Sequence, residues 1–120
     1  MNYNRGDIVI VPFPFVTTTR IQQKARPALV ISDHSIGRRF NDVILVGITS
    51  QRVDEVIQTE FLIEEGTSDF ISSGLAKTSV LRCEYVMTVP EEIITRKLGK
   101  LSKKIMSQID KILKVSLGLK

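Results

Sequence analysis

Short apolar segments, each followed by prolines or turn residues, dominate the first fifty positions and constrain the fold more than any other feature. Segments of this length that are rich in valine and isoleucine are typical of strands buried on both faces. We expect such strands at residues 7–15, 27–32 and 42–49. Pro12 and Pro14 lack the backbone donor that a central strand needs, so strand pairing should stop there.

Two later segments alternate between apolar and polar residues, as strands with one exposed face do. They cover residues 56–64 and 78–89, and Pro90 should end the second. Arg82 and Glu84 are two positions apart in that segment, so their side chains should share one face of the strand. The connecting loops are expected at residues 16–24, 32–41 and 66–74.

One long helix is predicted at the C-terminal end. Ser102 is a suitable N-cap, and Leu101 and Met106 stand where a hydrophobic staple would fix the start of the helix. The apolar stripe comprises Ile105, Ile109, Ile112, Leu113 and Leu117. A short helical piece is also expected at residues 91–96. These elements predict a single, mainly β domain over residues 1–120, in which five or six short strands form a small curled antiparallel sheet or barrel.

Composition narrows the classes of protein to which the chain can belong. Apolar residues make up 42% and charged residues 25% of the 120 positions, as in packed globular domains. No apolar run approaches the ~20 residues that cross a bilayer, and the N-terminus lacks a signal-like stretch, so a cytoplasmic protein is expected. One cysteine and one histidine exclude an internal disulfide and a zinc-ligand set. The net charge of +4 is compatible with a polyanionic partner, and the absence of tryptophan argues against a broad base-stacking surface.

Arg26 is the first residue that could carry chemistry. Because it precedes Pro27, its backbone should be extended, which would hold the guanidinium at the entrance of the second strand. The planar guanidinium suits a phosphate. For this residue alone, an arginine that merely covers the strand edge is the favoured interpretation.

Two further groups each have a functional and a purely structural interpretation. Residues 49–52, Thr-Ser-Gln-Arg, could hold a phosphate and its sugar at the end of the third strand, or could form an ordinary turn. Arg82 and Glu84 combine a cation that stabilises a phosphate with a proton acceptor, as acid/base cleavage of a phosphodiester requires. Considered alone, that pair is better explained as an exposed strand face with a weak ion pair.

Motifs along nearly the whole chain, in their order and spacing, resemble the MazF/PemK family of type II toxin–antitoxin toxins. They are R-G-D-I-V-I-V-P-F-P-F at residues 5–15, R-P-A-L-V-I-S at 26–32, I-T-S at 48–50, G-L-A-K-T-S-V-L at 74–81 and R-K-L-G-K-L-S at 96–102. The resemblance implies an SH3-like barrel of the CcdB/MazF type with a C-terminal helix, assembled as a homodimer. It also implies an acidic cognate antitoxin as partner.

The resemblance further implies a metal-independent endoribonuclease, without a cofactor, that cleaves single-stranded mRNA at short motifs through attack of a 2′-hydroxyl. Arg26 matches the arginine of the family's R-P motif and Thr49 the threonine of its I-T-S motif, both active-site positions. Arg82 and Glu84 match the outer residues of an R-C-D triplet, with glutamate in place of aspartate. RNA contacts are expected at Thr18, Arg20, Lys24, Ser50, Gln51, Arg52 and Lys77.

Two departures from the family pattern bear on activity. Residues 16–25 lack the glycines and the glutamate usual in this loop, and Tyr85 replaces a common glutamine. Two other functions therefore remain open. One is a gyrase-directed toxin of the same fold that acts by protein binding through its C-terminal helix. The other is a weakly active relative that mainly regulates its own operon.

Overall fold

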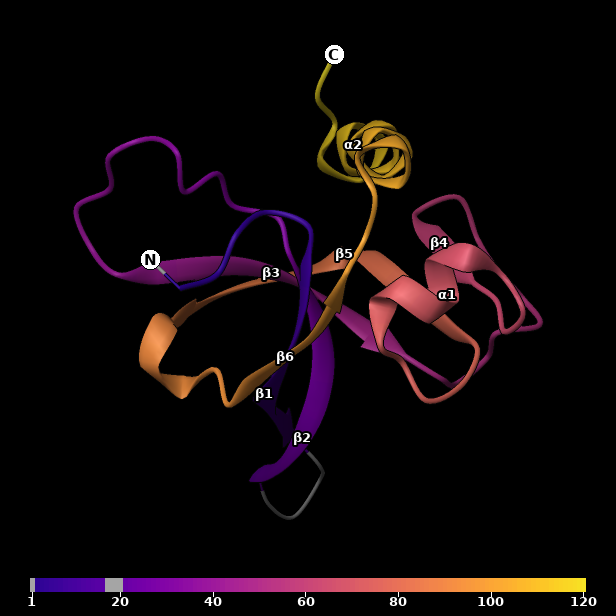
Figure 1. Ribbon diagram of the computed structural model, residues 1–120, viewed down its shortest axis with the longest axis horizontal. Helices are drawn as coiled ribbons and strands as arrows, with labels where there is room; N and C mark the ends of the chain where they lie inside the picture. Colours follow the sequence, from indigo (N-terminus) through magenta and orange to yellow (C-terminus); the bar gives the residue numbers. More distant parts are fainter. Residues whose placement is uncertain (1, 17–20) are drawn as a thin grey trace.

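The described part of the chain forms one antiparallel sheet of six strands. The computed structural model describes residues 2–16 and 21–120, with side chains described outside residues 13–23. The strand order is β4-β5-β3-β2-β1-β6 (Figure 1). The strands are β1 (Asp7–Val16), β2 (Ile21–Val30), β3 (Asp42–Thr49), β4 (Glu60–Ile63), β5 (Ser79–Pro90) and β6 (Arg96–Lys100). The helices are α1 (Ser68–Ser73), the 3-10 turn η1 (Glu91–Ile93) and α2 (Lys103–Leu117).

Both faces of the central strands are buried, which explains their continuous apolar sequence. Ile8 and Val46 pack in one cluster with Ile109 of α2, which lies on one side of the curled sheet (Figure 1). Their chain neighbours Val9 and Leu45 belong to a second cluster, because successive side chains of a strand point to opposite faces. The predicted fold class, a curled antiparallel sheet with a C-terminal helix, is confirmed.

The expectation that Pro12 and Pro14 end strand pairing is wrong. The pairing of β1 with β2 continues past both prolines to the end of β1. On the opposite side, β6 stops pairing at Ile10, whose carbonyl accepts a hydrogen bond from Thr95 N over 2.9 Å. The two prolines follow Ile10 at even spacing, so their nitrogens point to the side that β6 has already left. The missing donors therefore cost no bond in the ladder.

Several loops and short elements also differ from the expectation. The loop predicted at 16–24 is shorter, because β2 begins at Ile21, and β4 is confined to Glu60–Ile63, with Ile57 57% exposed in front of it. The loop predicted at 66–74 contains α1. Of the helical piece expected at 91–96, only the turn η1 forms, and Arg96 already belongs to β6.

Helix α1 follows β4 in the chain and packs against β6, so it lies between the two edge strands of the sheet. This contact requires two glycines. A Cβ on Gly99 would stand 2.2 Å from Ser72 O, and a Cβ on Gly74 would stand 2.2 Å from Leu98 O. No real side chain tolerates such distances, so backbone meets backbone here and gives the sheet its barrel-like closure.

Helix α2 begins as predicted. Ser102 Oγ accepts a hydrogen bond from Ile105 N over 3.2 Å, and Leu101 and Met106 are buried in the same cluster. The predicted stripe fails only at Leu117, which is 53% exposed. In the part of the chain that the structure describes, no helix has both the length and the apolar character needed to cross a membrane.

Candidate functional site

Two adjoining pockets are built from β2, β3 and β5, and Arg26 and Ile48 line both of them. Each has a volume of about 160 Å³. The first is completed by Gly47, Thr49, Gln51, Arg82 and Tyr85. The second is completed by Pro27, Ser50, Leu75, Ala76, Lys77 and Ser79. We call the two pockets together the Arg26 groove. It gathers cations and hydroxyls from segments that are far apart in the sequence.

Because Arg26 precedes Pro27, it was expected at the entrance of a strand. It lies instead inside β2. It is paired with Val11 of β1 in a register that runs without a break. On the other side of β2, pairing with β3 begins at Ala28, directly after Pro27. The backbone of Arg26 is therefore held by a continuous ladder, which gives its guanidinium a rigid base at the groove.

Thr49 takes part in a turn and also lines the groove, so both arrangements that the sequence left open occur together. Its Oγ1 accepts a hydrogen bond from Gln51 N over 3.1 Å, which is an ordinary turn contact at the end of β3. The same residue lines the first pocket with Gln51, while Ser50 lines the second. Because a hydroxyl both accepts and donates, the turn contact leaves its proton available for a ligand oxygen. The turn thus presents the side chains of three consecutive residues to the groove.

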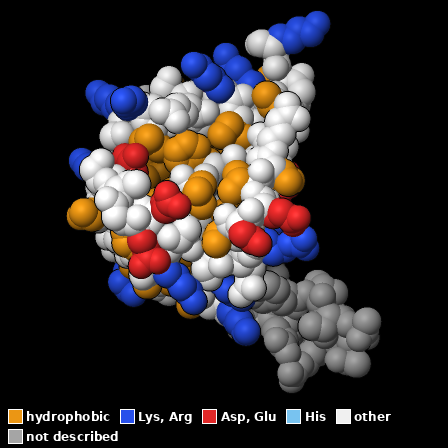
Figure 2. Space-filling model, turned by 90° about the vertical axis from the view of Figure 1, so that its right-hand side faces the viewer, with side chains coloured by type: hydrophobic (Ala, Val, Ile, Leu, Met, Phe, Trp, Pro, Cys, Tyr) orange, Lys and Arg blue, Asp and Glu red, His pale blue; other side chains and the backbone are white. Residues whose placement is uncertain are grey.

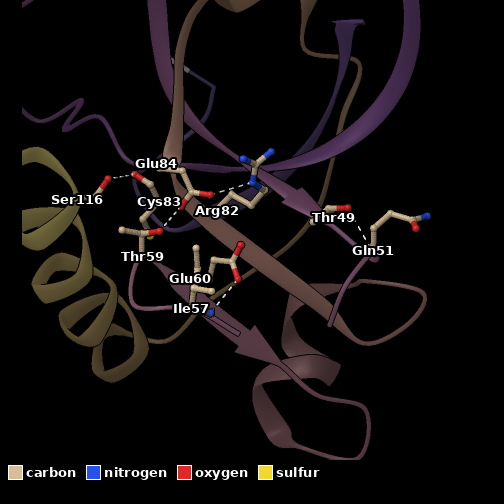
Figure 3. A network of polar contacts seen from close by, with 9 residues as sticks. All are labelled: Thr49, Gln51, Ile57, Thr59, Glu60, Arg82, Cys83, Glu84 and Ser116. Carbon is tan, nitrogen blue, oxygen red and sulfur yellow. Dashed lines mark hydrogen bonds and ion pairs between the residues drawn. The ribbon is translucent and has the colours of Figure 1, made fainter. Parts of the chain in front are cut away.

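Arg82 and Glu84 are in contact on one face of β5, as their spacing predicted. Arg82 Nε donates to Glu84 Oε1 over 3.0 Å, and the hydroxyl of Thr59 donates to the other carboxylate oxygen (Figure 3). Arg82 lines the first pocket, whereas Glu84 is absent from the lining of both. Glu84 therefore flanks the groove and fixes the orientation of the guanidinium that enters it.

The hydrogen bonds around Glu84 set its charge. Partial burial raises the pKa of Glu84, but hydrogen bonds from Thr59 and Arg82 and the positive charge of Arg82 outweigh that effect. The pKa of Glu84 therefore lies below its ordinary value, and the group is an ionised proton acceptor at neutral pH. Burial, and next the charge of Glu84, raise the pKa of the Cys83 thiol to about 11. That thiol stays protonated and unreactive between the two functional side chains.

Gly47, Ile48, Thr59 and Tyr85 also build or support the site, although the sequence did not single them out as candidates. Tyr85 Cγ lies 3.5 Å from the position that a Cβ on Gly47 would occupy, so the ring packs over the bare backbone of β3. The guanidinium carbon of Arg82 is 5.3 Å from the centre of the Tyr85 ring, a cation–π contact. The register of β3 with β5 brings Gly47 beside Arg82, whereas Thr59 reaches the site from the segment before β4.

The structure places the other expected RNA contacts differently from one another. Lys24 is exposed and lines neither pocket, and Arg52 is turned to solvent, where it pairs with Glu55 over 2.8 Å. Lys77 lines the second pocket. Thr18 and Arg20 lie outside the described residues.

The face of the molecule that carries α1 and β4 is not one broad positive surface (Figure 2). On the face that carries α1 and β4, acidic and basic side chains surround an apolar patch (Figure 2). The groove, in contrast, receives Arg26, Arg82 and Lys77. These three cations give the groove a local positive charge that suits an anionic ligand.

Comparison with known proteins identifies the chain. A curated relative, Endoribonuclease EndoA of Bacillus subtilis (strain 168), is 31% identical over 120 residues, which cover 99% of this chain and 97% of that protein. A mycobacterial endoribonuclease, solved in complex with its cognate antitoxin, shares the fold with a TM-score of 0.73 and 24% identity over 98% of this chain and 97% of that one. A MazE-MazF crystal structure from Deinococcus radiodurans also has a TM-score of 0.73, with 16% identity over 100% of this chain and 99% of that one.

The motifs, the fold and the groove agree with a match to a family model over residues 4–117, whose description is a PemK-like, MazF-like toxin of type II toxin-antitoxin systems. This chain therefore belongs to the PemK-like, MazF-like family of type II toxins.

Proposed function

We propose that the chain is an endoribonuclease toxin that cleaves single-stranded RNA at short motifs in the Arg26 groove. The observation that carries the proposal is the convergence of Arg26 from β2, Arg82 from β5 and Thr49 from β3 on one pocket. Two guanidinium groups and a hydroxyl form an array of donors suited to a phosphodiester. The naming of a 31% identical relative as an endoribonuclease supports the same activity. We propose mRNA as this single-stranded RNA, and an mRNA substrate implies that the protein acts in the cytoplasm.

The proposed reaction is an internal transfer. The 2′-oxygen of one nucleotide attacks the adjacent phosphorus, and the bond from phosphorus to the 5′-oxygen of the next nucleotide breaks. The products are a 2′,3′-cyclic phosphate and a 5′-hydroxyl. Because the nucleophile is held beside its target in the substrate itself, the step does not require a metal-activated water.

The residues of the groove and the flanking Glu84 have distinct roles in this proposal. Glu84 accepts the proton of the 2′-hydroxyl, for which its lowered pKa keeps it ionised at neutral pH. Arg26 and Arg82 stabilise the additional negative charge on the phosphorane and assist the departing 5′-oxygen. Thr49 and Ser50 position the phosphate, and Lys77 extends the cationic groove along the strand of RNA.

The proposal includes two protein partners. Relatives have been solved with a cognate antitoxin and as a MazE-MazF assembly. An acidic antitoxin segment would compete with RNA for the cations of the Arg26 groove, because both ligands carry negative charge at intervals along an extended chain. We also propose a homodimer, as in the family.

The decisive experiment incubates the purified protein with a mixed single-stranded RNA in the presence of a chelator and analyses the ends of the products. Cyclic phosphate ends are expected from the wild type and should be nearly absent with Arg26→Ala. Arg39→Ala is the matched control, because Arg39 is an exposed arginine outside the groove. An intact RNA after incubation with the wild type would contradict the proposal and favour a toxin that acts by protein binding. Equal cleavage by Arg26→Ala would contradict it as well, because the cleavage would then not depend on the Arg26 groove.

A further inference from the structure

Strand β5 carries a large irregularity at the groove. Along β3, Val46 and Gly47 are neighbours, but their partners in β5 are Val86 and Arg82. Residues 83–85 therefore have no partner in β3. Such bulges bend a strand and redirect its side chains. We call Arg82 to Val86 the β5 bulge. Three of the side chains at the site, those of residues 82, 84 and 85, project from it.

The backbone of Cys83, in the middle of the β5 bulge, is fixed by two other parts of the molecule. Its N–H donates to the carbonyl of Thr59 over 2.9 Å. Its carbonyl accepts from Ser116 Oγ, near the end of helix α2, also over 2.9 Å (Figure 3). Buried backbone groups need such partners. Since β3 supplies none here, the conformation of the bulge depends on the segment before β4 and on the docking of α2.

Thr59 is also the residue whose hydroxyl holds the carboxylate of Glu84. Thr59 therefore fixes the bulge twice, through its carbonyl at Cys83 and through its side chain at Glu84. The neighbouring Glu60 is paired with Arg82 across the strands, but its carboxylate accepts from Ile57 N over 3.0 Å. The orientation of Arg82 is thus set by Glu84 and the ring of Tyr85, both carried by the β5 bulge.

We infer that Ser116 and Thr59 are positioning residues that hold the β5 bulge and so aim Arg82 and Glu84 at the Arg26 groove. Ser116 lines neither pocket, and its hydroxyl holds the bulge through a hydrogen bond to the backbone of Cys83. The C-terminal helix then has a role at the groove beyond covering the core, because its docking determines the geometry of the groove. The effect on catalysis rests on the proposed ribonuclease function, whereas the effect on geometry does not.

The test measures that geometry directly, by NMR on the full chain. The carboxyl carbon of Glu84 is titrated with pH, and the Nε–Hε signal of Arg82 is followed, in the wild type and in Ser116→Ala. We expect Ser116→Ala to raise the pKa of Glu84 toward its ordinary value and to shift the Arg82 signal toward that of an exposed arginine. Ser107→Ala, at an exposed serine of the same helix, should match the wild type.

Two further variants complete the test. Ser116→Thr keeps the hydroxyl and should restore the wild-type signals. If Ser116→Ala does not fold, the nearly isosteric Ser116→Cys, with a weaker donor, takes its place. A folded Ser116→Ala or Ser116→Cys whose Glu84 titration and Arg82 signal equal those of the wild type would overturn the inference.

A cleavage assay separates this inference from the proposed function. In Ser116→Ala we expect kcat to fall by about tenfold with little change in KM, since small misplacements of catalytic groups slow the chemical step more than binding. An unchanged kcat would overturn the catalytic part of the inference. If the wild type cleaves no RNA, the ribonuclease proposal fails, and the NMR signals still decide whether Ser116 positions the β5 bulge.

Discussion

Arg26 and Arg82 reach the same pocket from two very different supports. Arg26 lies in β2, where pairing with β1 continues without interruption on both sides of it. Arg82 is the first residue of the β5 bulge, where pairing with β3 is interrupted. There the N–H of Cys83 donates to the carbonyl of Thr59 and the carbonyl of Cys83 accepts from Ser116 Oγ. A ladder depends on backbone groups that every residue except proline supplies, whereas the bulge depends in addition on the side chains of Ser116 and Thr59. Substitutions at a distance should therefore disturb Arg82 far more easily than Arg26.

The largest effect is expected from Arg26→Ala. Removing a positively charged donor from the developing phosphorane should lower kcat by about 10²- to 10³-fold. The free energy of unfolding should change by less than about 1 kcal/mol, because the ladder does not need the side chain. Steady-state cleavage and denaturant unfolding measure both quantities. A strongly destabilised Arg26→Ala would show that the side chain, and not the ladder, holds this part of β2.

Arg82→Lys should have the next largest effect. Arg82 donates to Glu84 through Nε while its guanidinium lies against Tyr85 at the pocket. A lysine carries one charged nitrogen and cannot make both contacts, so kcat should fall by roughly ten- to a hundredfold. Single-turnover cleavage measures the change, with Arg39→Lys as the control. Cleavage within twofold of the wild type would show that charge alone suffices at this position.

A smaller and pH-dependent effect is expected from Thr59→Val. The hydroxyl of Thr59 helps to lower the pKa of Glu84, so its loss should move the acidic limb of the kcat/KM profile to higher pH. Thr59→Ser should keep the wild-type limb. A limb that stays in place in Thr59→Val would exclude Glu84 as the group that titrates there.

Thr59→Val should also change how the free energy of unfolding depends on pH. The folded-state pKa of Glu84 is lowered, so its contribution to stability is present above the unfolded-state pKa and is lost as the pH falls through the folded-state value. The difference in unfolding free energy between wild type and Thr59→Val should therefore shrink at acid pH. A difference that is constant across the titration of Glu84 would contradict this.

The smallest effect is expected from Pro12→Ala, in the ladder beside Arg26. The nitrogen of Pro12 points to the side where β6 has ended, so restoring an N–H adds no bond within the sheet. The unfolding free energy should change by less than about 1 kcal/mol, chiefly through the flexibility of the unfolded chain. Cleavage should stay within twofold. A larger change in either quantity would show that Pro12 contributes to holding Arg26.

The strand ladder that holds Arg26 and the β5 bulge that holds Arg82 differ in how far the sequence predicts them. Continuous apolar runs predicted the central strands, and β3 has the expected bounds at both ends. The contact of Arg82 with Glu84 followed from their spacing. The extension of β2 to Ile21 was missed, because polar residues in a strand paired mainly on one side look like a loop. The β5 bulge was missed, because nothing in residues 82–86 themselves interrupts the alternation of a regular strand.

The sequence alone determined the class of fold, the helix from Ser102 onward and the candidate residues Arg26, Thr49, Arg82 and Glu84, because these depend on local periodicity, capping and motif spacing. Tertiary structure decided which of the expected RNA contacts reach the groove. It brought Lys77 to the second pocket and left Lys24 and Arg52 outside both. It also recruited Thr59, Ser116 and, through packing on Gly47, Tyr85 to the support of the site. Such contacts depend on the register between strands and on helix docking, which join residues more than twenty positions apart and leave no local pattern in the chain.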